Sequence, residues 1–202
     1  MRILFVVPKM YTRNELLSIS GDIPEDFEAK SKEFWDYVAE RLKRPRVINR
    51  IYIDSLTKYE GEDSIKLVTE TDTGCGELVG GLVSEGAMLQ TSEDPLLIEE
   101  TASWASMLDV VTDGEAQTII DLMSQNMSDR NRFLTKIIGE TLKENETGVL
   151  FIRPGRDIAG YLQSDIKVIK IQPFEPSDYL DSWLVTLKLK PKSKKADNSV
   201  YP

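Results

Sequence analysis

The chain contains no histidine and only one cysteine, Cys75, among its 202 residues. The absence of imidazole excludes the Ser/His/Asp triad, the Cys/His dyad and the commonest zinc sites for this chain acting alone. A single thiol cannot form an intrachain disulfide, which favours the cytoplasm as the compartment. Because no histidine is present to accept its proton, we expect Cys75 to be a buried structural thiol rather than a nucleophile.

Long hydrophobic runs are also missing. The first apolar run, Ile3–Val7, ends at Pro8 and Lys9 and is too short for a signal peptide core. No later run approaches the roughly 18 apolar residues needed to cross a bilayer, so we expect no membrane insertion. The net charge of −9 argues against a protein that grips nucleic acid with its whole surface. The arginines and the lysine-rich tail keep a nucleic-acid-associated factor as a weaker alternative.

Four short apolar segments predict strands: Ile3–Val7, Val47–Ile53, Val149–Ile152 and Ile166–Ile171. The spacing of these segments leaves room for helices between them. The run at 149–152 is typical of a sheet that is covered on both faces. We therefore predict an α/β fold, with a mostly parallel sheet flanked by helices, in a single domain over residues 1–190. Alternating leucine and lysine predict a last, edge strand at Trp183–Leu189. Residues 191–202 are predicted to be a flexible basic tail.

The middle of the chain, about residues 62–127, shows almost no strand signal and is predicted to be an all-helical insertion between strands. Helices are expected at Asp63–Thr71, Glu77–Leu89, Pro95–Leu108 and Gly114–Met127. The glycine-rich segment 74–81 lacks the lysine and hydroxyl of a P-loop and follows no clear strand. We expect its Gly80 and Gly81 to permit close helix packing instead.

The most sharply patterned stretch runs from Ser128 to Ile171. Ser128 can cap a new helix, and Asp129 places a negative charge at its positive end. The helix predicted to begin there is followed by the strand at 149–152, which stops at the charged loop Arg153–Asp157. In open α/β sheets ligands usually lie at such carboxyl ends. We expect the strand ends at Pro8 and Arg153 to lie side by side, with the Ser128 helix opening toward them.

Arginine binds carboxylate or phosphate with two hydrogen bonds from its planar fork. We therefore predict an anion site at this edge of the sheet, formed by Lys9, Arg130, Arg132, Arg153 and Arg156. The alternative for residues 129–132 is a charged helix start with solvated arginines. The expected function is a non-catalytic binding or interaction protein, whose partner is a small anionic ligand or another protein. No cofactor or metal ligand is assigned.

A second hypothesis is a hydrolase that uses carboxylates alone, with Mg²⁺ or Mn²⁺ as optional ions because these accept oxygen ligands. Its candidate catalytic residues are Asp129, Asp157 and Glu70. Apolar surface around Tyr179 and Trp183 is either a homodimer contact or ordinary core.

Three segments, SDRNRFLTKII, VLFIRPGRDI and DIKVIKI, together resemble the C-terminal part of the TraB/ChaN-like superfamily, which includes Tiki-type proteases and erythromycin esterase-like enzymes. In that superfamily a helix opening with an acidic residue and arginine precedes a strand ending in Gly-x-x-His, and a similar motif follows the first strand. This chain has Pro154-Gly155-Arg156-Asp157 and Pro8-Lys9-Met10-Tyr11 there, without either histidine. The resemblance implies a sheet with a helical insertion, and metal-assisted or general-base hydrolysis.

Overall fold

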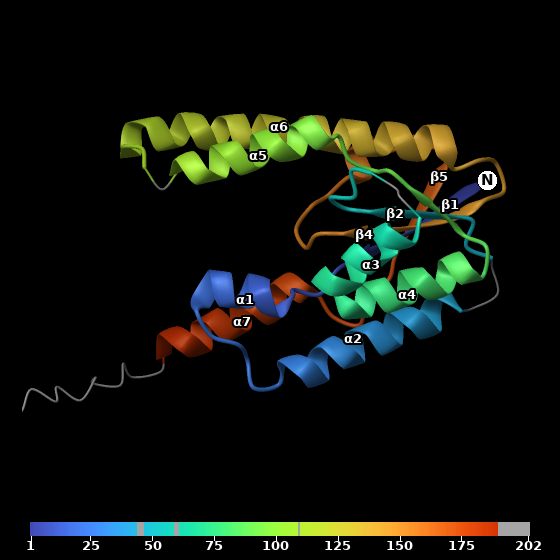
Figure 1. The fold of residues 1–202 in the computed structure, drawn as a ribbon, viewed down its shortest axis with the longest axis horizontal. Coiled ribbons are helices and arrows are strands. Elements are labelled where there is room, and N and C mark those ends of the chain that lie inside the picture. The colour runs from blue at the N-terminus through green and yellow to red at the C-terminus, as the bar shows by residue number, and fades with distance from the viewer. Residues whose placement is uncertain (44–46, 59–60, 109, 190–202) are drawn as a thin grey trace, which may run out of the picture.

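The computed structural model describes residues 1–43, 47–58, 61–108 and 110–189 (Figure 1). Its five strands form one sheet in the order β3-β2-β4-β1-β5, and every described strand pair is parallel. The predicted α/β fold with a parallel sheet is confirmed. The strands are β1 (Arg2–Pro8), β2 (Arg50–Ile53), β3 (Met88–Gln90), β4 (Thr147–Ile152) and β5 (Ile166–Lys170).

Helices cover both faces of this sheet (Figure 1). They are α1 (Arg13–Ser20), α2 (Phe27–Leu42), α3 (Glu62–Thr71), α4 (Thr73–Ser84), α5 (Pro95–Leu108), α6 (Asp113–Thr141) and α7 (Pro176–Leu189), with a 3₁₀ turn η1 (Ala159–Tyr161). The central strand β4 is buried at all six positions, as its continuous apolar run predicts.

Alternate strand residues supply two separate cores, because successive side chains point to opposite faces of a sheet. On one face, Val149 and Phe151 pack with Phe34 and Trp35 of α2 and with Val79 of α4. On the other face, Leu150 packs with Leu4 and Tyr52 of the sheet and with Leu134 and Ile138 of α6. The carboxyl-terminal half of α6 is therefore the helix that covers this second face.

The helix predicted to begin at Ser128 does not begin there. Residues 113–141 form one continuous 29-residue helix, which also absorbs the helix expected at Gly114–Met127. Ser128 lies in its interior, where its hydroxyl donates to the Ser124 carbonyl oxygen at 3.1 Å. The true start is at Thr112, whose backbone N–H and hydroxyl both donate to the Glu115 carboxylate. A serine followed by an aspartate thus resembled a cap without being one.

The amino-terminal half of α6 extends beyond the sheet together with α5 (Figure 1). The two helices are joined by Asn126, which donates to the Leu97 carbonyl oxygen at 3.1 Å and to Glu100 at 2.8 Å, and whose amide oxygen lies 2.7 Å from the Thr101 hydroxyl. The predicted helix at Pro95–Leu108 is confirmed residue for residue.

Two other local predictions are wrong, and one helix was not predicted. The segment 183–189 belongs to helix α7, because Leu180, Trp183 and Leu184 pack against the core at helical rather than alternating spacing. The segment 62–127 is not entirely helical, since β3 forms at 88–90, where the helix Glu77–Leu89 was expected to end. Helix α1 follows Lys9 and starts at a Thr12/Glu15 capping box. The predicted tail at 191–202 lies outside the described residues.

The glycine-rich segment serves packing, but through other glycines than expected. A Cβ atom on Gly74 would lie 2.2 Å from Trp35, and one on Gly76 would lie 2.4 Å from the Thr69 Cα. Gly81 has nothing within 4 Å, and Gly80 meets only an ordinary contact with Ile65. The expectation for Gly80 and Gly81 is therefore wrong: the close approach lies at the start of α4.

Two further expectations concern side chains of the core. Cys75 is fully buried, and burial raises the pKa of its thiol well above the usual range. Tyr179 and Trp183 pack against the same core as α2, and the Tyr179 hydroxyl donates to Asp26 at 3.0 Å. Both aromatic residues therefore pack against the core and stay partly exposed. Within the described residues, no helix combines the length and apolar character that crossing a membrane requires.

Candidate functional site

The carboxyl ends of three neighbouring strands bring candidate residues to one edge of the sheet. Pro8 of β1 is paired with Ile152 of β4, and the Lys9 N–H continues the ladder to the Ile152 carbonyl oxygen at 2.7 Å. The predicted neighbourhood of the Pro8 and Arg153 strand ends is therefore confirmed. On the other side of β4, β2 ends at Ile53 and is followed by Asp54. Lys9, Arg153 and Asp54 thus follow three adjacent strands.

Behind these strand ends lies a buried ionic cluster, formed by Asp54, Glu93, Arg130 and Arg156 with the amide of Asn131. The Arg130 guanidinium is held by both oxygens of Glu93, with Nε 3.0 Å from Oε2 and Nη2 3.2 Å from Oε1. Its Nη2 also donates to Asp54 Oδ1 at 3.2 Å. Arg130 reaches the edge from the middle of α6, so the helix opening expected at Ser128 does not point toward the strand ends.

Arg156 completes the cluster from the loop after β4. Its Nη1 donates to Asp54 Oδ1 at 2.6 Å and also to Glu93 Oε1, and its Nε donates to Asn131 Oδ1 at 2.8 Å. The Arg156 side chain is only 2% exposed, and its Nη2 atom is buried without a hydrogen-bond partner among the described residues. Two arginines and two carboxylates balance one another, which is what permits them to be buried at all.

The Asp54 carboxylate is ionised in this environment. Burial raises its pKa, but the positive charges of Arg156, Arg153 and Lys9 outweigh burial and lower it to about 2. Both Asp54 oxygens are in use, because Oδ2 accepts from the Arg153 backbone N–H at 3.0 Å. Asp54 therefore links the strand ends of β2 and β4 as well as the two buried arginines.

The five predicted anion-binding residues consequently fall into three places. Arg130 and Arg156 are engaged by carboxylates of the protein itself. Arg132 lies on the exposed side of α6, 62% exposed, where it pairs with Asp129 at 2.6 Å. Lys9 and Arg153 line a hollow that none of the other three lines.

This hollow, called the Lys9 hollow below, has a volume of about 430 Å³. Within the described residues, the Lys9 ammonium makes no hydrogen bond and no ion pair. The Arg153 side chain is 46% exposed, and its Nε lies 3.6 Å from Asp54 Oδ2, too far for a hydrogen bond. Two cations with free donor groups therefore face one space at the carboxyl edge of the sheet.

Three carboxylates that stand outside the ionic cluster also line the Lys9 hollow: Glu15, Glu70 and Asp72. Glu15 accepts from the Thr12 backbone N–H at 2.7 Å and from its hydroxyl at 2.9 Å. Asp72 caps α4 by accepting from the Cys75 N–H at 3.1 Å, and burial raises its pKa. Glu70 accepts no hydrogen bond in the described structure and lies 3.9 Å from Lys66.

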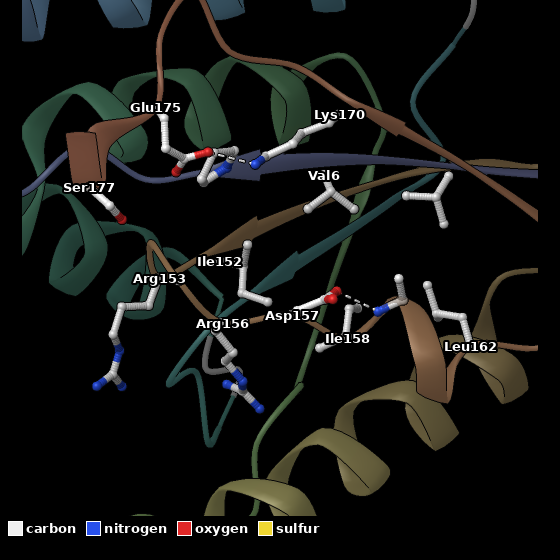
Figure 2. A pocket seen from close by; sticks show the side chains of 14 residues that line it. Val6, Ile152, Arg153, Arg156, Asp157, Ile158, Leu162, Lys170, Glu175 and Ser177 are labelled. Carbon is white, nitrogen blue, oxygen red and sulfur yellow. Dashed lines mark hydrogen bonds and ion pairs between the residues drawn. The ribbon is translucent and has the colours of Figure 1, made fainter. Parts of the chain in front are cut away.

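A second hollow of about 420 Å³ borders strands β1, β4 and β5 (Figure 2). Its floor is apolar and comes from β1, β4, β5 and the η1 segment: Val6, Ile152, Ile158, Leu162 and Val168. Figure 2 shows the guanidinium groups of Arg153 and Arg156 pointing away from Val6. Its charged rim is internally paired, because Lys170 binds Glu175 at 2.7 Å and Asp157 accepts from the Ala159 N–H at 2.8 Å. Of the residues that the structure describes, Arg153 alone lines both hollows.

The three candidate catalytic carboxylates do not converge. Asp157 lines the second hollow, and Glu70 lines the Lys9 hollow. Asp129 lies half exposed on α6 beside Gln125 and Arg132. Among the residues that the structure describes, no three Asp, Glu or Cys side chains are grouped so as to hold a metal ion.

Sequence reasoning missed two members of the ionic cluster. Asp54 was visible as the residue after a predicted strand, but Glu93 follows β3, which the sequence pattern did not reveal. Comparison of the chain with models of protein families, with curated proteins and with solved structures finds no match.

Proposed function

We propose that this protein is a non-catalytic binding protein that holds a small anion between Lys9 and Arg153. The supporting observation is that these two cations line one hollow without hydrogen bonds from the Lys9 ammonium or the Arg153 guanidinium in the described structure. The place fits as well, because ligands of open α/β sheets sit outside the carboxyl ends of the strands.

The chemistry of the two cations indicates an oxyanion as the bound group. Arg153 presents a planar fork that suits the two oxygens of a carboxylate or phosphate, and Lys9 adds a point charge on a flexible stem. The Arg153 backbone is held in place by its bond to Asp54. The buried ionic cluster thus positions the loop, while the free guanidinium of Arg153 is left for the ligand.

The test is anion-dependent stabilisation, with inorganic phosphate and acetate as probes. We expect each anion to raise the melting temperature of the wild type, since a ligand that binds only the folded state stabilises it. Lys9→Gln and Arg153→Gln should lose this shift, and raised ionic strength should weaken it in the wild type. The matched control is Arg132→Gln, which removes an exposed arginine elsewhere. Equal shifts in all three variants would assign the anion effect to another place and end the proposal.

We also propose a cytoplasmic location, for which the single buried thiol is the support. A distant relationship to the TraB/ChaN-like superfamily stays a hypothesis, and anion binding by Lys9 and Arg153 does not depend on it.

A further inference from the structure

The Lys9 hollow has walls of opposite charge. Lys9 and Arg153, which follow β1 and β4, stand on the wall formed by the strand ends. Glu15, Glu70 and Asp72 come from α1, from α3 and from the joint between α3 and α4. Within the described residues no ion pair joins the two walls.

Charges on the two walls interact electrostatically across this space. The positive charge of Lys9 lowers the pKa of Asp72, although burial raises it more strongly. Yet none of the described ion pairs includes Lys9, so its ammonium lies more than 4 Å from every carboxylate there. An interaction at this range, without direct contact, leaves room for a ligand between Lys9 and the acidic wall.

One carboxylate of the acidic wall, Glu70, accepts no hydrogen bond in the described structure. Glu15 and Asp72 are occupied in capping α1 and α4. Glu70 is 61% exposed and has only the 3.9 Å contact with Lys66 on its own helix, which as a surface pair contributes little. A Glu70 carboxylate and two free cations therefore face a single hollow.

A ligand with acidic groups alone would satisfy Lys9 and Arg153 but would meet three carboxylates opposite. A ligand that also carries an ammonium group would satisfy both walls, since electrostatic complementarity rejects like-charged placements. We propose that the ligand is a small zwitterion of the free amino acid type, with its carboxylate at Lys9 and Arg153 and its ammonium at Glu70. This inference rests on the proposed function, because it names the ligand class of the same site.

The experiment compares molecules that differ in a single charged group. The standard amino acids are titrated against the full-length protein by calorimetry. The tightest binder is then compared with its deaminated acid and its decarboxylated amine. We expect the amino acid to bind more tightly than either fragment. Glu70→Gln should weaken binding of the amino acid about 3- to 10-fold, as expected for a partly exposed charged hydrogen bond. The same substitution should not weaken binding of the deaminated acid.

Glu62→Gln is the matched control, because Glu62 is an exposed glutamate at the other end of α3 and lines no part of the Lys9 hollow. It should leave every affinity unchanged. The zwitterion proposal is refuted if the amino acid binds no better than its deaminated acid, or if Glu70→Gln weakens binding of the two molecules equally. Anion binding by Lys9 and Arg153 would stand in either case. If neither phosphate, acetate nor any amino acid depends on Lys9 and Arg153, the proposed function itself falls.

Discussion

Arg130 and Glu93 form a bidentate ion pair in which both side chains are almost wholly buried, at 1% and 0% exposure. They are 37 residues apart in the chain, and the pair fastens the middle of α6 to the segment that follows β3. Asp54 and Arg156 extend it to the ends of β2 and β4. The helix that covers one face of the sheet is therefore tied by charge to the edge where the proposed ligand lies.

Arg156→Ala should destabilise the fold by about 3 to 5 kcal/mol, because it leaves Asp54 and Glu93 buried with one arginine fewer. Arg153→Ala, which removes a half-exposed side chain from the same loop, should change stability by no more than about 1 kcal/mol. Urea denaturation of both variants gives the comparison. An Arg156→Ala protein as stable as the Arg153→Ala protein would refute the structural role of the cluster.

Stability should fall in acid partly through Asp54. Its folded pKa of about 2 lies below the unfolded value of roughly 3.9, so the folded state binds fewer protons. This contribution to the free energy of unfolding is about 2 to 3 kcal/mol. It is present above the unfolded pKa and is lost as the pH falls toward 2. Unfolding free energies measured between about pH 5 and 2 should therefore decline less steeply in Asp54→Asn than in the wild type. Parallel curves would contradict the depressed pKa.

Gly76→Ala should destabilise the protein by about 1 to 3 kcal/mol, since overpacking against a backbone atom forces the helices apart. The added Cβ would lie 2.4 Å from the Thr69 Cα. Gly81→Ala, on the same helix with open space around it, should be neutral or stabilising by up to about 1 kcal/mol. Melting temperatures distinguish the two. If both substitutions are tolerated alike, the close packing of α3 and α4 is not what this segment provides.

Ser128→Ala should leave stability unchanged or raise it by up to about 0.5 kcal/mol, because alanine is the better residue in a helix interior. Thr112→Ala removes the hydroxyl at the actual start of α6 and should cost about 1 kcal/mol. Chemical denaturation of the pair tests where the helix begins. A cost at Ser128 as large as that at Thr112 would show that a helix starts at residue 128 after all.

The local sequence was sufficient for the elements whose pattern depends on burial alone. The apolar runs at β1 and β4 and the spacing of α5 follow from period and propensity, and so does the parallel α/β class. The same local rules misled at Ser128, where a cap-like pair sits inside a long helix, and at Leu187, whose alternation with lysine imitates a strand.

What only the tertiary structure decided is which charge meets which. The sequence alone determined that arginines and carboxylates follow the strands, but Arg130 and Arg156 could equally have faced a ligand. Folding places Glu93 and Asp54 against them. Among the described residues, it leaves Lys9 without an ion pair and Arg153 with only a 3.6 Å approach to Asp54. The physical reason is that a buried charge is tolerable only when neutralised nearby, and the neutralising groups come from segments that are distant in the chain and meet only in the folded state.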